Sequence, residues 1–190
     1  MLVSSRDDGL TWSEPRNLTE EVKPSEWSYL LQGPGRGITA HDGTLVFPAQ
    51  FQLSPAKGRT PHSTVLVSRD RGATWKVGVP AKSDTTEAAV VETLDGVYML
   101  NMRDNRGGSR SVYTTQVPLM GWTEHSTSRS ALREPVCMAS LIHVGREIDG
   151  EADGRLIFSN PDVDRGPRRR MSLRASDDNG VTWATATVLL

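Results

Sequence analysis

The residues of this chain that could do acid–base or ion-binding chemistry stand where strands are expected to begin or end. Glu87 opens one apolar run, and Arg103 closes the following run sixteen residues later. A carboxylate can take a proton from a weak acid, and a planar guanidinium grips a carboxylate through paired hydrogen bonds. Both residue types also occur on solvated surfaces, so their roles depend on the elements that position them.

Other chemically capable residues are scattered along the chain. Gln50 and Gln52 alternate onto one face of a strand that begins at Phe47-Pro48, where they could line a pocket. The single cysteine, Cys137, lies in an apolar stretch that favours a buried thiol over a reactive one. The four histidines show no metal-ligand spacing: His41, His62, His125 and His143. We therefore expect neither a metal nor a cofactor.

The elements that position these residues follow from an eight-residue pattern that occurs three times. It reads Ser-x-Asp-x-Gly-x-Thr-Trp, at residues 5–12, 68–75 and 176–183. The Asp can accept hydrogen bonds from N–H groups of its own turn, the Gly supplies a positive φ, and the Trp is an apolar plug. The spacing and closing Glu of a calcium loop are absent from this pattern. We therefore expect a structural turn and not a ligand site.

Strand-like runs lie between these turns, and long helical periodicity is missing from the sequence. Asp-Gly pairs at 42–43 and 95–96 stand between apolar alternations, which is typical of hairpins. A longer loop is expected at 146–154. Successive spacings of 63, 47 and 61 residues separate Trp12, Trp75, Trp122 (in a degenerate copy) and Trp183. Each length fits one four-stranded propeller blade.

The predicted fold class is therefore all-β, with a single partial propeller domain over residues 1–190. Blade-like units are expected at about 13–75, 76–122 and 123–183. A closed ring needs more blades than these, so the chain is expected to be an internal segment of a larger propeller.

Bulk composition argues against several classes of protein. The chain has 190 residues, with 22 Lys and Arg against 23 Asp and Glu and a net charge of −1. This balance gives no electrostatic footprint for nucleic acid or a membrane surface. No window approaches about 18 consecutive apolar residues, so no membrane-spanning helix is expected. No signal peptide is visible, because the N-terminus runs almost directly into the first turn.

The repeated turn resembles the Asp-box of sialidases (neuraminidases), which are six-bladed propellers that remove terminal sialic acid from glycans. The resemblance runs over nearly the whole chain, and 135–140 is similar to bacterial members. Three further stretches resemble more specific segments of the family: 27–38 followed by 42–50, 87–92 through 100–103, and 159–161 followed by Arg168.

The resemblance implies an exo-α-sialidase that retains configuration, with a tyrosine nucleophile and a glutamate that takes its proton. Glu87 matches this glutamate, and Arg103 and Arg168 match two of three arginines that hold the sialic acid carboxylate. That carboxylate would repel a carboxylate nucleophile, which explains the use of tyrosine. Gln50 and Gln52 could line the pocket for the sugar's side chain or for the leaving group.

The resemblance also implies partners and a location. The substrates would be sialylated glycoproteins, gangliosides or oligosaccharides, with no cofactor and no nucleic acid. A bacterial parent protein would be secreted or periplasmic.

Parts of the family pattern are not matched in this chain. The first arginine and the aspartate acid/base belong upstream of residues 27–50, and the nucleophilic tyrosine belongs after the last Asp-box. Tyr29, Tyr98 and Tyr113 lie in other places. We therefore expect these 190 residues alone to be inactive and the activity to belong to a longer parent protein.

Alternative interpretations stay open. A non-catalytic Asp-box propeller would bind glycans or proteins, and would not need Glu87, Arg103 and Arg168 to face one centre. A glycosidase with two carboxylates would need a further Asp or Glu opposite Glu87. A truncated gene product would have no function. Glu92, five residues beyond Glu87, is a competing base, although its place along the strand favours a structural partner.

Overall fold

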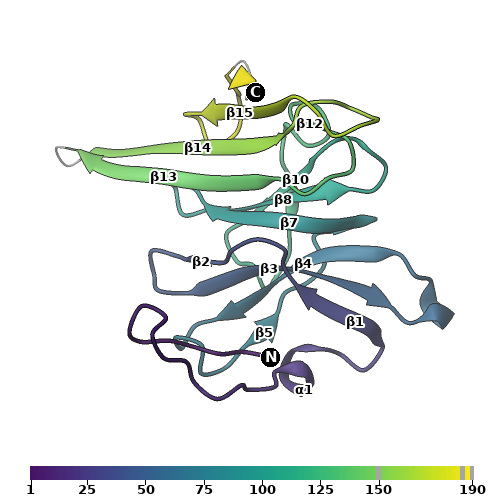
Figure 1. Ribbon diagram of the computed structural model, residues 1–190, viewed down its shortest axis with the longest axis vertical. Helices are drawn as coiled ribbons and strands as arrows, with labels where there is room; N and C mark the ends of the chain where they lie inside the picture. Colours follow the sequence, from purple (N-terminus) through teal and green to yellow (C-terminus); the bar gives the residue numbers. More distant parts are fainter. Residues whose placement is uncertain (149–150, 185–186, 189–190) are drawn as a thin grey trace.

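The computed structural model describes residues 1–148, 151–184 and 187–188. Three antiparallel sheets lie one above another, with the N-terminus beside the first sheet (Figure 1). The four principal strands of each sheet follow one another along the chain, so hairpin connections join them. The sheets are consecutive blades of a β-propeller, as the sequence predicts.

The first sheet has the strand order β1-β3-β4-β5, with β2 paired to β3 and β6 paired to β4. A short helix, α1 (Thr19–Val22), precedes the sheet, and a single 3-10 turn, η1 (Pro55–Lys57), joins β3 to β4. The strands are β1 (Trp27–Gln32), β2 (Ile38–Thr39), β3 (Leu45–Leu53), β4 (Pro61–Ser68), β5 (Lys76–Val77) and β6 (Lys82–Ser83).

The second and third sheets repeat this arrangement more simply. The second sheet contains β7 (Thr85–Glu92), β8 (Tyr98–Asp104), β10 (Ser111–Thr115) and β11 (Thr123–Glu124). The third sheet contains β13 (Ser140–Ile148), β14 (Glu151–Pro161), β15 (Met171–Ser176) and β16 (Thr187–Val188). A small ladder of β9 (Gly108–Ser109) and β12 (Arg133–Glu134) joins the segments between them.

The second sheet is buried on both faces, which explains the four consecutive apolar residues, 88–91, in β7. Ala88 and Val90 pack in a cluster with the first sheet. Ala89 and Val91 belong to a different cluster, which includes Leu156 of the third sheet. Because the two sets alternate along one strand, β7 contributes to two separate cores between sheets.

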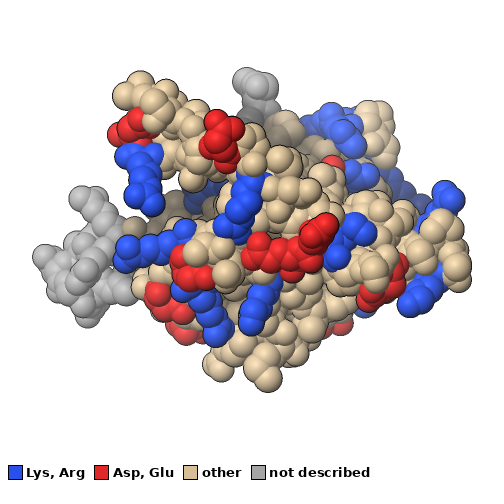
Figure 2. Space-filling model, turned by 90° about the horizontal axis from the view of Figure 1, so that it is seen from below, with Lys and Arg blue, Asp and Glu red and all other residues tan. Residues whose placement is uncertain are grey.

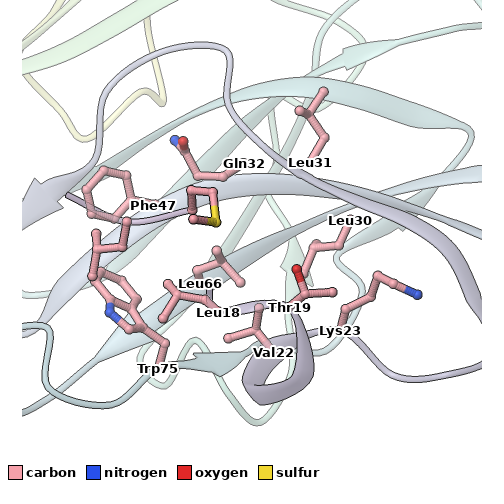
Figure 3. A pocket seen from close by; sticks show the side chains of 12 residues that line it. Leu18, Thr19, Val22, Lys23, Leu30, Leu31, Gln32, Phe47, Leu66 and Trp75 are labelled. Carbon is pink, nitrogen blue, oxygen red and sulfur yellow. The ribbon is translucent and has the colours of Figure 1, made fainter. Parts of the chain in front are cut away.

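The other face of the first sheet carries a third apolar cluster, in which Leu18 and Val22 pack with Ala49, Leu66 and Trp75. A cavity of about 320 Å³ opens beside this cluster (Figure 3). It is lined by Met1, Leu2, Leu18, Thr19, Val22, Lys23, Leu30, Leu31, Gln32, Phe47, Leu66 and Trp75. Viewed from below, the molecule shows acidic and basic side chains interspersed, in keeping with its net charge of −1 (Figure 2).

The repeated turns share one hydrogen-bond pattern. The Asp70 carboxylate accepts hydrogen bonds from the Thr74 N–H at 2.8 Å, the Thr74 hydroxyl at 2.6 Å and the Ser68 hydroxyl at 2.8 Å. Equivalent bonds surround Asp7 and Asp178. In each copy the Thr hydrogen bonds lower the pKa of the carboxylate to about 2, with a smaller contribution from the Ser. The prediction of a structural turn is confirmed.

The structure differs from the sequence predictions at β1 and at residues 146–154. β1 was not predicted, because its burial does not alternate: Trp27 is buried and the next two residues are exposed. The predicted loop at 146–154 is wrong for most of its length, because β13 and β14 pair as far as Ile148 and Glu151. Residues 149–150 lie outside the described residues. The charged, Gly-containing sequence indicates a loop, but ladder hydrogen bonds do not require apolar side chains.

The predicted blade-like units and the observed sheets are offset by one or two short strands. The unit boundary after Trp75 falls immediately before β5 and so separates both β5 and β6 from the rest of the first sheet. The boundary after Trp122 falls immediately before β11, the last strand of the second sheet. Trp122 packs against the core between these sheets, but its indole N–H has no partner in the described part of the chain. No helix in the described ranges is long and apolar enough to cross a membrane.

Candidate functional site

Most of the predicted site residues lie toward one end of the stacked sheets. β8 and β14 both run toward the right of Figure 1, and each is the second strand of its sheet. β7 starts where β8 ends, because Thr85 pairs with Asp104. Glu87 therefore lies near the beginning of one strand and Arg103 near the end of its neighbour.

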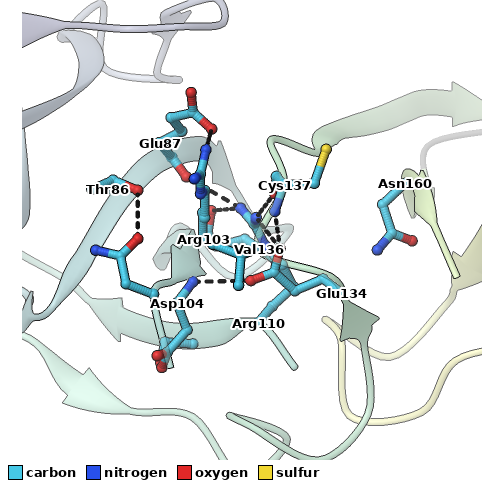
Figure 4. Close-up of polar contacts among 12 residues, drawn as sticks. Thr86, Glu87, Arg103, Asp104, Arg110, Glu134, Val136, Cys137 and Asn160 are labelled. Carbon is cyan, nitrogen blue, oxygen red and sulfur yellow. Dashed lines mark hydrogen bonds and ion pairs between the residues drawn. The ribbon is translucent and has the colours of Figure 1, made fainter. Parts of the chain in front are cut away.

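Glu87 and Arg103 form an ion pair at this end. The distance from Glu87 Oε2 to Arg103 Nη1 is 2.6 Å, with about a quarter of each side chain exposed (26% and 24%). Figure 4 shows one carboxylate oxygen of Glu87 directed at Arg103. Arg103 Nε is buried and has no hydrogen-bond partner in the ranges that the structure describes. The pair thus combines solvent access with an unsatisfied donor.

A β-bulge explains how Glu87 comes to face Arg103. Thr85 pairs with Asp104 and Ala88 pairs with Met102, so Thr86 and Glu87 together oppose the single residue Arg103. A bulge of this kind inserts one residue, bends the strand and redirects a side chain.

Arg168 lies in the exposed connection between β14 and β15, as do Arg165, Arg169 and Arg170. Its Nη2 donates a hydrogen bond to the Val136 carbonyl at 3.5 Å. Val136 itself has a φ of +54°, a left-handed conformation that is strained for a β-branched residue. Among the described residues, no hydrogen bond joins Arg168 directly to Glu87 or Arg103.

Gln50 and Gln52 lie two residues apart on β3, but their surroundings differ. Gln50 is buried, and its Oε1 has no partner among the residues described. Gln52 Nε2 instead donates to the Arg59 carbonyl in the connection to β4. Gln50 therefore keeps a buried, unused acceptor within the described part of the chain.

Glu92, the competing base, sits at the other end of β7. It accepts hydrogen bonds from the backbone N–H of His41 at 2.8 Å and lies 2.9 Å from His41 Nδ1. These contacts tie β7 to the turn before β3, so Glu92 has the structural partner that its position suggests. Within the described ranges, no group of three His, Cys, Asp or Glu residues could hold a metal ion.

Arg110, which the sequence gives no reason to single out, lies fully buried beneath the Glu87–Arg103 pair. Its Nε donates to Asn101 Oδ1 at 2.7 Å, and its Nη1 donates to the Cys137 carbonyl at 2.8 Å. Its counter-ion is Glu134, at 3.5 Å. Burial lowers the pKa of Arg110 to about 10, so it keeps its charge at neutral pH.

Asp104, next to Arg103, is also fully buried and ionised. Its carboxylate accepts hydrogen bonds from Arg106 at 2.7 Å and from the Ser111 hydroxyl at 2.7 Å, and it pairs with Arg129. Burial raises the pKa of Asp104, but these hydrogen bonds outweigh it and lower the pKa to about 2. Asp104 thus anchors the end of β8.

Taken together, the site offers a half-buried carboxylate that can accept a proton and a guanidinium that can hold an anion. Comparison with known proteins identifies the family of the chain. The family model described as the BNR repeat-like domain matches residues 1–190. This chain belongs to the BNR repeat-like family.

The chain is also similar to individual sialidases. It is 52% identical to a sialidase of Bacteroides fragilis, over 100% of this chain and 34% of the relative. The solved Hadza microbial sialidase Hz136 superposes with a TM-score of 0.90 at 53% identity, over 98% of this chain and 36% of that one. A Trypanosoma rangeli sialidase, solved with 2,3-difluorosialic acid as a covalent intermediate, gives a TM-score of 0.72 at 25% identity, over 93% and 29%.

The chain spans between a quarter and two fifths of the length of these sialidase-family relatives. The comparisons establish the propeller fold and the family, while the roles of Glu87, Arg103, Arg168, Gln50 and Gln52 stay predictions.

Proposed function

We propose that this chain forms part of an exo-α-sialidase, which releases terminal sialic acid from glycoconjugates with retention of configuration. The observation that carries the proposal is the Glu87–Arg103 ion pair at the β7 bulge. It occurs in a chain that is similar over its whole length to a protein named as a sialidase.

Glu87 acts in this proposal as the base for a tyrosine that another part of the protein supplies. A phenol has a pKa of about 10 and is a poor nucleophile until a base takes its proton. After Glu87 accepts this proton, the phenolate oxygen attacks the anomeric carbon of sialic acid. The glycosidic bond breaks, and an acid elsewhere in the protein gives its proton to the departing oxygen.

Water completes the proposed reaction. It attacks the anomeric carbon and gives a proton to the group that protonated the departing oxygen. The carbon–tyrosine bond breaks, and Glu87 returns its proton to the tyrosine. Two displacements on the same carbon retain the configuration. The covalent intermediate in the Trypanosoma rangeli sialidase supports this route by family likeness.

In this proposal the two arginines bind the carboxylate of the substrate. Arg103 Nη1 lies 2.6 Å from Glu87 Oε2, so a carboxylate bound at Arg103 brings the anomeric carbon to which it is attached near the base. Arg168 would reach the same carboxylate from the connection after β14. Guanidinium groups suit this role because they stay charged and form paired hydrogen bonds.

The test compares Glu87→Gln with Glu92→Gln in the complete protein that contains this chain. Loss of the base is expected to lower kcat toward a fluorogenic sialoside by about 10²- to 10⁴-fold. The matched Glu92→Gln variant, altered on the same strand but at the other end, is expected to keep kcat within a few fold. Full turnover by the folded Glu87→Gln protein would contradict the proposal. Sialoside binding without turnover by the unmodified protein would favour a glycan-binding module.

We also expect residues 1–190 alone to leave the sialoside intact, because the sequence after the last Asp-box contains no tyrosine. Turnover by the purified chain that disappears in Glu87→Gln would refute this expectation.

A further inference from the structure

The bulge that carries Glu87 interrupts the pairing of β7 with β8 at residues 86–87, and side chains from two neighbouring segments donate hydrogen bonds to the carbonyls of these two residues. The Ser63 hydroxyl, from β4 in the first sheet, donates to the Thr86 carbonyl at 2.6 Å. Arg110 Nη2, from just before β10, donates to the Glu87 carbonyl at 3.3 Å. Both Ser63 and Arg110 are completely buried.

Arg110 reaches this carbonyl because its other donors are fixed on both sides. Besides Asn101 Oδ1, it donates to the Asn101 carbonyl at 3.0 Å. Figure 4 shows the guanidinium lying between Glu87 and the segment with Cys137. Only a guanidinium offers donors in so many directions within one plane, so a lysine could not replace these bonds.

Glu134 connects this hydrogen-bond network to the backbone of Asp104 and Cys137. Its Oε1 accepts a hydrogen bond from the backbone N–H of Asp104, the residue after Arg103, at 3.1 Å. Its Oε2 accepts from the backbone N–H of Cys137 at 2.8 Å. Cys137 follows the strained residue Val136, whose carbonyl accepts a hydrogen bond from Arg168. A strained residue persists only when its surroundings hold it in place.

We propose that Arg110 and Ser63 are positioning residues that hold the two carbonyls of the bulge and thereby aim the Glu87 carboxylate at Arg103. Glu134 acts with them as the counter-ion of Arg110 and as the acceptor that fixes the backbone next to Arg103. Neither Arg110 nor Ser63 touches the substrate. The inference rests on the proposed function, because it concerns the geometry of the same base.

The test uses two variants of the complete protein, Arg110→Lys and Ser63→Ala. Arg110→Lys keeps the buried charge but loses the donor to the Glu87 carbonyl. Ser63→Ala frees the other carbonyl without altering any charge, and so covers the case in which the Arg110 variant does not fold. A displacement of about 1 Å in a catalytic group can cost about 10²-fold in rate. We expect kcat to fall by about 10²-fold in Arg110→Lys and about 10-fold in Ser63→Ala, with smaller changes in KM.

A second readout follows the bulge itself without requiring turnover. Hydrogen exchange of the peptide spanning residues 84–91 is expected to be faster in both variants. Asp70→Asn, in an Asp-box away from the bulge, serves as the control: it weakens the fold but should change neither kcat nor exchange in this peptide. A purely structural role would instead make kcat follow overall stability in all three variants.

The outcomes separate this inference from the proposed function. Unchanged kcat and unchanged exchange in folded Arg110→Lys and Ser63→Ala would overturn the positioning role, even with an active wild-type protein. An inactive wild-type protein would contradict the proposed sialidase activity. Faster hydrogen exchange in both variants would still support the inference that Arg110 and Ser63 hold the bulge in place.

Discussion

Four acidic side chains in and beside the second sheet have different environments and therefore different uses. Glu87 is partly exposed and contacts one guanidinium, whereas Glu134 is fully buried and accepts hydrogen bonds from two backbone N–H groups. Asp104 is buried among arginines, and Glu92 is tied to His41. Of the four, Glu87 alone combines partial exposure with an arginine partner at the site end of its strand. Its environment, more than its residue type, makes it the candidate base.

At the residue scale, Asp104 should make the stability of the fold sensitive to acid. The pKa of Asp104 is about 2 in the folded protein, below the value of about 3.9 for an unfolded chain. A depressed pKa stabilises the fold above the unfolded value, and this contribution is lost as pH falls from about 4 toward 2. The loss should amount to about 2 kcal/mol.

Urea unfolding of the wild-type chain and Asp104→Asn at several pH values tests this. The difference in unfolding free energy between the two should shrink as pH falls from 5.5 to about 2.5. A difference that stays constant over this range would show that Asp104 has an ordinary pKa.

At the element scale, the Asp-box is a self-contained turn whose Trp fixes it to the fold in one copy and not in another. The hydrogen bonds around Asp7 and Asp70 are nearly the same, and both Trp rings donate to a Gly carbonyl at 3.1 Å. Trp75 is only 4% exposed, whereas Trp12 is 61% exposed. Local sequence thus determines the turn, and packing determines what the turn contributes to stability.

Trp75→Ala should therefore destabilise the 190-residue chain far more than Trp12→Ala. Removing a buried Trp leaves a cavity and costs about 3–5 kcal/mol, while an exposed ring contributes within about 0.5 kcal/mol. Thermal unfolding followed by circular dichroism gives both values. Equal losses in the two variants would mean that Trp12 is buried in solution.

At the scale of the whole molecule, the two faces of the second sheet join all three sheets into one packed unit. Leu100 belongs to the core between the first and second sheets, and Leu156 belongs to the core between the second and third. Both side chains are almost completely buried. Because each sheet can bury an apolar face only against its neighbour, the sheets should unfold together.

Leu100→Ala and Leu156→Ala should each lower the stability of the chain by about 2–5 kcal/mol. Each should also shift one common transition, so that calorimetry and circular dichroism report the same midpoint. Two separated transitions in the Leu156→Ala protein would show that the third sheet unfolds independently.

The sequence by itself determined the features that depend on neighbouring residues. Asp70, Gly72 and Trp75 form their turn from side chains within one eight-residue segment, so repetition of the pattern sufficed to predict strands, turns and a propeller. The apolar run at residues 88–91 likewise indicates a strand from neighbouring residues alone. The resemblance to a family indicated Glu87 and Arg103 as site residues. That they lie next to each other follows only from the pairing of β7 with β8.

Only the tertiary structure decided which side chains act on distant backbone. Arg110 reads as a surface arginine after a Gly-Gly-Ser turn, and Ser63 reads as an ordinary strand residue. Their bonds to the Glu87 and Thr86 carbonyls cross between strands and sheets, over 23 residues of sequence in each case. A bulge depends on register, which is set by the cooperative pairing of whole strands, so no local pattern could reveal it.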